Sequence, residues 1–208
     1  MLTPIDPTAL PVVILNGFGT PRFVAEIYGN TFRERGFQVF TAPQRCLNYG
    51  DVRISARLAA DEIARVRAVT GASKVHLVGM SLGGLTGLYY LKVLGGADSV
   101  ARFVSIGGPL NGSTLALALT RVFGHHVPSL VQSAPENDLL LELRAAPPPD
   151  GVRMFSMGTR GDILTPHCWE AEGFEPVETP FGWFPVGHWM LFSHPANKRL
   201  AVELLARP

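Results

Sequence analysis

The amino-acid sequence predicts an α/β protein with about six strands, mainly parallel, and helices covering both faces of the sheet. Short apolar runs alternate with stretches of helical periodicity from one end of the chain to the other. Such alternation is typical of parallel sheets, whose strands are joined by crossover helices. Hydrophobic residues make up 47% of the 208 residues and charged residues only 17%, which agrees with strands buried on both sides. A chain of this length is expected to form one domain, residues 1–208.

Five apolar runs predict the successive strands of the sheet. Each run is short, rich in β-branched or aromatic residues, and bounded by glycine, proline or polar residues. The runs are PVVILNG (11–17), FQVFTA (37–42), KVHLVG (74–79), ARFVSIGG (101–108) and VRMFSMG (152–158). A further short run, Phe181 to Val186, lies closer to the end of the chain.

Helical periodicity fills the intervals between these runs. After the first strand, Thr20 is the expected N-cap of a helix, with Pro21 at the first helical position. One helical face is expected after the second strand, and its apolar positions are Ile54, Leu58, Ile63 and Val66. Helices are also expected from Leu82 to Leu91 and over the final residues 195–208.

Residues 113–150 interrupt the alternation, because they hold apolar helical pieces but no strand. The segment is longer than a plain crossover between two parallel strands requires. We expect it to form a short helical cap over the carboxyl edge of the sheet. The alternative is merely two packed helices.

Ser81 stands among glycines in the stretch LVGMSLGGLTG (77–87), between a predicted strand and a predicted helix. The G-x-S-x-G pattern alone arises by chance in roughly one chain in ten of this composition. Strand, tight turn and helix in that order are, however, what a nucleophile elbow requires. A serine hydroxyl needs a neighbouring base to take its proton. The pattern therefore predicts Ser81 as a nucleophile, with a histidine and an acid to follow; a plain strand-to-helix turn is the alternative.

The acid is expected to be Asp162, which lies in a glycine-punctuated loop just beyond the strand at 152–158. Aspartate is also a favoured turn residue, so a purely local role is the alternative. Glu175 or Glu178 is the reserve candidate.

Six histidines compete for the role of base, and His188 is favoured. It follows the run at 181–186 and precedes the final helix. His194 is the second choice, but it precedes Pro195 and is expected to cap that helix. The remaining four are expected to be sheet, cap or loop residues: His76, His125, His126 and His167.

The first predicted strand runs into the glycine-rich loop ILNGFGTP (14–21). We expect the backbone N–H of Phe18 to face that of Leu82 across the site, as a two-donor oxyanion hole. A phosphate-binding loop is the alternative. Gly17 and Gly19 supply only part of a G-x-G-x-x-G pattern, however, because residue 22 is an arginine.

These segments together resemble the α/β-hydrolase superfamily, and more narrowly the small bacterial lipases and the esterases related to GPI inositol-deacylases. The matching stretches, in chain order, are LNGFGTP, TGASKVHLVGMSLGGLTGLYYL, VSIGGPLNGS, GTRGDILTP and GHWMLFSHP. The resemblance implies an α/β-hydrolase fold. It also implies the triad Ser81, Asp162 and His188, in the chain order of that fold, with Phe18 and Leu82 as oxyanion donors.

The chain departs from those lipases at two positions. They usually carry histidine where this chain has Asn16, and often another where it has Met80. Neither position belongs to the triad, but both flank the expected oxyanion hole.

The expected activity is hydrolysis of carboxylic esters with apolar acyl groups, through an acyl-enzyme on Ser81. The partner is then a small-molecule ester or a lipid. An acyltransferase or thioesterase with the same triad is one alternative. A non-catalytic ligand-binding protein on the same fold is another, since a fold does not fix a function.

Composition argues against several other classes of function. The net charge is +1 and no block of like charges occurs, so no nucleic-acid partner is indicated. No stretch approaches the ~20 apolar residues of a membrane span, and the N-terminus does not look like a signal peptide, so a cytoplasmic location is the default. Cys46 and Cys168 match no metal or redox spacing, and no cofactor or metal is expected.

Overall fold

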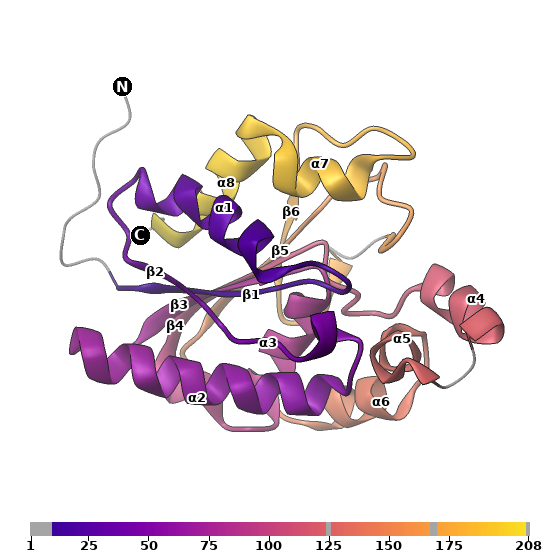
Figure 1. The fold of residues 1–208 in the computed structure, drawn as a ribbon, viewed down its shortest axis with the longest axis horizontal. Helices are drawn as coiled ribbons and strands as arrows, with labels where there is room; N and C mark the ends of the chain where they lie inside the picture. Colours follow the sequence, from indigo (N-terminus) through magenta and orange to yellow (C-terminus); the bar gives the residue numbers. More distant parts are fainter. Residues whose placement is uncertain (1–9, 124–125, 167–169, 207–208) are drawn as a thin grey trace.

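Six parallel strands form one sheet in the order β2-β1-β3-β4-β5-β6 (Figure 1). The structure is a computed structural model that describes residues 10–123, 126–166 and 170–206; His125, His167 and Cys168 lie outside these ranges. The strands are β1 (Val12–Leu15), β2 (Val39–Thr41), β3 (Val75–Met80), β4 (Val100–Ile106), β5 (Arg153–Gly158) and β6 (Glu175–Glu178). This sheet confirms the predicted fold class.

Helices cover both faces of the sheet. The helices are α1 (Arg22–Arg33), α2 (Val52–Thr70), α3 (Leu82–Lys92), α4 (Thr114–Phe123), α5 (Pro128–Ser133), α6 (Asp138–Ala145), α7 (Gly187–Ser193) and α8 (Pro195–Ala206), with short 3₁₀ turns η1 (Cys46–Asn48) and η2 (Gly96–Ser99). Figure 1 shows α1, α7 and α8 on one face of the sheet and α2, α3 and α6 on the other.

Strand alternation divides the core into two layers. In β1, Val12 and Ile14 pack against α1 and α8, while Val13 and Leu15 pack against α2 and α3. All four side chains are buried, as expected for a strand covered on both faces. Both layers continue through β3, β4 and β5, so the centre of the sheet is a rigid platform for the loops at its carboxyl edge.

The five predicted strands are confirmed, and the sixth lies earlier than the run at 181–186. Residues 175–178 form β6, which pairs with β5 alone and is an edge strand. An edge position tolerates Pro176, because one side of the strand needs no backbone donor. In the run 181–186, Val186 makes only an isolated antiparallel bridge to Asp162.

Two details of the predicted helices are wrong. The N-cap of α1 is Pro21, not Thr20, because the Thr20 hydroxyl donates to the Phe18 carbonyl at 3.0 Å instead. In helix α2, Ile63 and Val66 of the predicted face are buried, but Ile54 is 43% exposed. Its buried apolar positions are Val52, Ala56, Ala59, Ile63 and Val66. Small alanines suit a close contact with α3.

The expected cap over residues 113–150 is wrong for its last helix. Leu139, Leu140 and Leu143 of α6 are buried in the same core layer as α3, so this helix belongs to the body of the protein. Helix α4 packs on α5 and leaves Val122 and Phe123 more than half exposed. Figure 1 shows α4, with α5 beside it, beyond the carboxyl ends of the strands.

Three glycines let α3 lie directly on the sheet. A Cβ on Gly79 would come within 2.5 Å of the Gly83 carbonyl oxygen, and a Cβ on Gly83 within 2.8 Å of the Leu15 carbonyl carbon. A Cβ on Gly84 would collide with the Ser105 hydroxyl. Any larger residue at these positions would push the first turn of α3 away from β1 and β3.

We expect Gly83→Ala to lower the free energy of unfolding by at least about 2 kcal/mol, as overpacking against backbone does. Helix propensity alone would favour alanine over glycine by up to about 1 kcal/mol. A lower free energy of unfolding would therefore show that the collision of the added Cβ with the Leu15 backbone outweighs the gain in helix propensity. Gly50→Ala is the matched control, because a Cβ there meets nothing within 4 Å. It should change stability by less than about 1 kcal/mol. Urea denaturation of both variants measures this, and equal effects would contradict the packing account.

Candidate active site

Ser81 occupies a sharp turn between β3 and α3. Its backbone angles are φ 50° and ψ −120°, a conformation that residues with a Cβ rarely adopt. Hydrogen bonds hold the turn, because the Ser81 N–H donates to the Ile106 carbonyl at 2.7 Å and the Ser81 carbonyl accepts from the Gly84 N–H at 2.8 Å. The predicted elbow is therefore present, at the carboxyl edge of the sheet.

Three side chains from distant parts of the chain meet at this turn. His188 Nε2 lies 3.0 Å from Ser81 Oγ, and His188 Nδ1 lies 2.7 Å from Asp162 Oδ2. The aspartate and the histidine are both buried. The structure thus brings Ser81, His188 and Asp162 into one hydrogen-bonded line, as the sequence predicted.

The loops that carry Asp162 and His188 are packed on each other. The Gly187 N–H donates to the Gly161 carbonyl at 3.2 Å, and Val186 bridges Asp162. A Cβ on Gly187 would collide with the Gly161 backbone. His188 lies one residue further along, in the first turn of α7, after the run at 181–186 and before the final helix α8 as predicted. The contact between the loops therefore fixes the position of the imidazole relative to the carboxylate.

The Asp162 carboxylate is held by three further donors. Its Oδ1 accepts from the N–H groups of Leu164 at 2.8 Å and Thr165 at 2.9 Å. The Thr165 hydroxyl lies 2.8 Å from Oδ2 and 3.0 Å from the Gly107 carbonyl, and donates to one of them at a time. Burial by itself would raise the pKa of Asp162, but the bonds from His188 and Thr165 outweigh it and hold that pKa below its ordinary value.

An anionic Asp162 determines which nitrogen of His188 carries a proton. The carboxylate accepts a hydrogen bond from Nδ1–H, which leaves Nε2 as the acceptor facing the Ser81 hydroxyl. This tautomer is the one a general base requires. The reserve acids play no part, because Glu175 and Glu178 lie exposed on β6 and pair with Arg153 and Arg160.

The other described histidines do not reach Ser81. His194 accepts from the Ala196 N–H at 3.3 Å and stacks on Phe181, so its expected role as a helix cap is confirmed. His76 is buried within β3, where desolvation lowers its pKa to about 4. His126 is exposed near α5. His188 is therefore the described histidine that faces the serine.

The loop after β1 lies against the serine turn. A Cβ on Gly17 would stand 3.2 Å from Ser81 Cβ and 3.3 Å from the Met80 carbonyl oxygen. Phe18 follows on this loop, and its ring packs on that of Tyr49. Leu82 is the first residue of α3, where backbone N–H groups have no partner within the helix. The two expected oxyanion donors thus sit on segments that flank Ser81.

Asn16 and Asn48 hold this loop in place. The buried Asn16 accepts from the Gly17 N–H at 3.1 Å, and its amide nitrogen lies 2.7 Å from both the Thr20 carbonyl and Gln44 Oε1. The amide nitrogen of Asn48 lies 3.0 Å from the Asn16 carbonyl and 3.2 Å from the Gly17 carbonyl. Asn16 therefore supports the loop through its amide.

Sequence reasoning missed Asn48 and Thr165, and for different reasons. Asn48 reaches the loop because residues 46–48 all have positive φ and form a left-handed turn. No motif in the sequence predicted this turn. The contact of Thr165 with Asp162 could have been predicted, since Thr165 lies three residues after the aspartate, within the span of an Asx-type turn.

Within the described ranges, no three His, Cys, Asp or Glu side chains gather where they could hold a metal ion. Among the same residues, no helix is both long enough and apolar enough to cross a bilayer.

The amino-acid sequence is similar to one protein family and to a curated bacterial protein. The sequence model of the alpha/beta hydrolase fold family matches residues 11–137. A triacylglycerol lipase of Vibrio cholerae is 35% identical over 114 residues, covering 52% of this chain and 35% of that protein. This chain therefore spans about a third of the length of that curated relative.

Solved structures show the same fold. Mature lipase BlEst2 of Bacillus licheniformis superposes with a TM-score of 0.77 at 15% identity, over 98% of this chain and 94% of that one. Lipase B of Aspergillus fumigatus gives a TM-score of 0.73 at 19% identity, over 96% of this chain and 53% of that one. At such identities the likeness concerns the fold alone.

We expect Thr165→Val to destabilise the protein by about 1–2 kcal/mol at pH 7, because it removes a donor to a buried carboxylate. The folded-state pKa of Asp162 is below the ordinary 3.8, so the carboxylate stabilises the fold above that pH and loses its contribution as the pH falls through the folded-state value. The gap between variant and wild type should therefore shrink as the pH drops below about 4.

Denaturant unfolding from pH 7 down to the lowest pH at which both proteins fold measures that gap. Thr165→Ser keeps the hydroxyl and should stay near the wild type. A gap that is the same at every pH would mean that the hydroxyl does not act on the carboxylate.

Proposed function

The chain belongs to the alpha/beta hydrolase fold family, and we propose that it is a serine esterase that hydrolyses carboxylic esters of apolar acyl groups. The observation that carries the proposal is the line of hydrogen bonds from Asp162 through His188 to Ser81. A hydroxyl facing an imidazole that is oriented by a buried carboxylate has the arrangement of an activated nucleophile. The names of the similar lipases support the same class of substrate.

The first step of the proposed reaction transfers the acyl group to the serine. His188 Nε2 takes the proton from Ser81 Oγ as the oxygen attacks the ester carbonyl carbon. Negative charge develops on the carbonyl oxygen, which the N–H groups of Phe18 and Leu82 bind. The carbon–oxygen bond to the alcohol then breaks, and His188 gives its proton to the leaving alcohol.

The second step returns the free enzyme. A water molecule attacks the acyl carbonyl while His188 Nε2 takes one of its protons, and the same N–H groups bind the new oxyanion. The bond to Ser81 Oγ then breaks, the serine regains its proton from His188, and the carboxylic acid leaves. Ester and water are consumed, and one alcohol and one acid are produced.

Electrostatic preorganisation supplies much of the expected rate. Each oxyanion donor of this kind typically contributes about 3 kcal/mol to the transition state. The strained turn at Ser81 and the loop held by Asn16 would set the two donors before substrate arrives. The anionic Asp162 stabilises the imidazolium that forms in each step.

Exposed apolar side chains on the elements around the triad favour an uncharged acyl group. They come from the loop after β1, the turn at 46–49, the acid loop, the segment that leads into α7 and α7 itself: Phe18, Leu47, Tyr49, Ile163, Trp183, Phe184, Val186 and Trp189. Monomeric proteins rarely leave so many large apolar groups exposed on neighbouring segments without a binding role.

We expect Ser81→Ala and His188→Ala each to lower kcat for p-nitrophenyl butyrate by about 10⁴-fold or more, because each removes a member of a unit that acts together. His194→Ala is the matched control, since this histidine caps α8 and does not reach the serine. Its kcat should stay within a few-fold of the wild type. Steady-state kinetics on variants checked for folding by circular dichroism decide this, and a His188→Ala enzyme with more than a tenth of wild-type activity would contradict the proposal.

The same assay separates the esterase from its alternatives. An esterase should turn over p-nitrophenyl esters faster than acyl-CoA, and added alcohol should not divert the acyl group from water. Faster turnover of acyl-CoA would indicate a thioesterase, and transfer to the alcohol an acyltransferase. Tight binding of esters without turnover would indicate a ligand-binding protein.

A further inference from the structure

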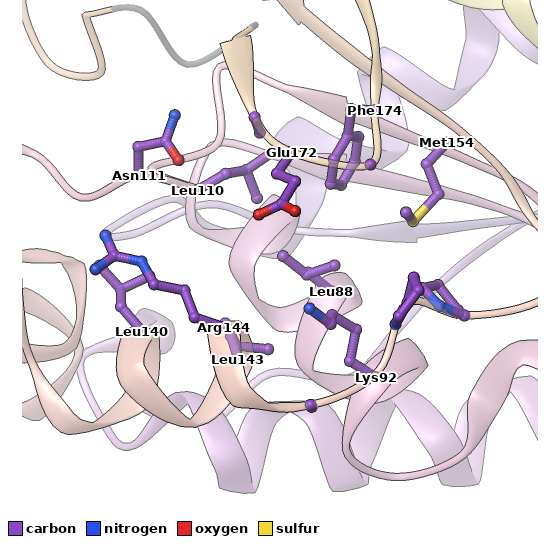
Figure 2. A pocket seen from close by; sticks show the side chains of 15 residues that line it. Leu88, Lys92, Leu110, Asn111, Leu140, Leu143, Arg144, Met154, Glu172 and Phe174 are labelled. Carbon is purple, nitrogen blue, oxygen red and sulfur yellow. The ribbon is translucent and has the colours of Figure 1, made fainter.

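A cavity lies between α3, α6, β5 and the segment before β6 (Figure 2). Its volume is about 420 Å³, within the range of sites that enclose small ligands. Neither Ser81, Asp162 nor His188 lines it. It lies on the sheet face that carries α2 and α3, where no described helix covers β5 and β6 as α3 covers the centre of the sheet.

The floor of this cavity is apolar, whereas polar and charged groups line its rim. Seven of its lining side chains are less than 10% exposed and are part of the core layer beneath the sheet: Leu88, Leu110, Leu140, Leu143, Met154, Ala171 and Phe174. An occupant must present hydrocarbon to this floor, because a polar group left there without a partner costs free energy, and polar atoms to the rim. The body of the ligand is therefore an aliphatic chain or a similar apolar group.

The rim of the cavity carries an excess of positive charge. Lys92 lies in the last turn of α3 and Arg144 in the last turn of α6, and Figure 2 shows both around the same space, with the carboxylate of Glu172 between them. Within the described part of the chain, neither cation makes an ion pair within 4.0 Å. Burial lowers the pKa of Lys92, and Glu172 offsets this only in part.

Lys92, Arg144 and Glu172 together carry a net charge of one positive unit, which one negative charge on a ligand would neutralise. A monoanionic head group would restore a partner to Lys92 and Arg144, whereas a dianionic head would meet Glu172 at close quarters. A cationic head would meet two basic groups and only one carboxylate. The apolar floor and the charged rim together thus favour a single-chain amphiphile with a monoanionic head, such as a carboxylate.

We propose that this cavity binds a medium-chain fatty acid, with its tail among the buried leucines and its carboxylate between Lys92 and Arg144. This inference rests on the proposed function for the origin of the ligand, because ester hydrolysis would release a fatty acid as its acid product. The cavity itself is a site separate from the serine, so binding and turnover are measured independently.

The test is a calorimetric titration of the Ser81→Ala protein with decanoate, below the concentration at which it forms micelles. We expect saturable binding of one decanoate per chain. Acetate should bind at least tenfold more weakly, because it leaves the apolar walls unfilled. Decanol and decyltrimethylammonium should also bind more weakly, since they lack the carboxylate.

Two charge variants localise the binding. Lys92→Gln and Arg144→Gln should each weaken decanoate binding by about fivefold to twentyfold, as the loss of a charged hydrogen-bond donor does. Arg57→Gln, on the exposed side of α2, is the matched control and should leave binding unchanged. Circular dichroism confirms that each variant folds.

Decanoate binding that is equal in all three variants, or decanol binding as tight as decanoate, would overturn the proposal. No measurable binding of decanoate would do the same. A protein that binds decanoate as expected but turns over no ester would retain the cavity assignment and lose the proposed function, so the two failures are distinguishable.

Discussion

The approach of α3 to the ends of β1 and β3 positions everything else in the site. Gly79, Gly83 and Gly84 remove the side chains that would keep helix and sheet apart. Ser81 is thereby forced into a positive-φ turn, which costs free energy on the order of 1–3 kcal/mol. The bonds of Ser81 to Ile106 and Gly84 offset that cost and leave its hydroxyl facing His188.

A buried carboxylate is the second element on which the geometry depends. Desolvation disfavours charge on Asp162, and only a full set of donors keeps it anionic. Those donors come from its own loop, through Leu164 and Thr165, and from α7, through His188. The same bonds that stabilise the charge also join two segments of the chain, so stability and the orientation of the base are coupled.

The sequence was informative where local patterns decide structure and less so where loops meet. Alternating apolar runs predicted five strands, and the spacing of Ser81, Asp162 and His188 along them predicted which side chains meet. The sixth strand was missed because Glu175–Glu178 is an exposed edge with no apolar run. Helix α6 was placed in a cap because its leucines indicate a buried helix but do not indicate which part of the protein it packs against. Asn48 depended on a left-handed turn that residue type alone did not reveal.

The central claim is that Ser81 is a nucleophile activated by His188, and covalent labelling tests it most directly. Wild-type protein incubated with a fluorophosphonate probe should incorporate one probe per chain, and peptide mass spectrometry should locate it on Ser81. Labelling should vanish in Ser81→Ala and fall sharply in His188→Ala, whereas His194→Ala should label like the wild type. A folded wild-type protein that takes up no probe, or takes it up at another residue, would contradict the account.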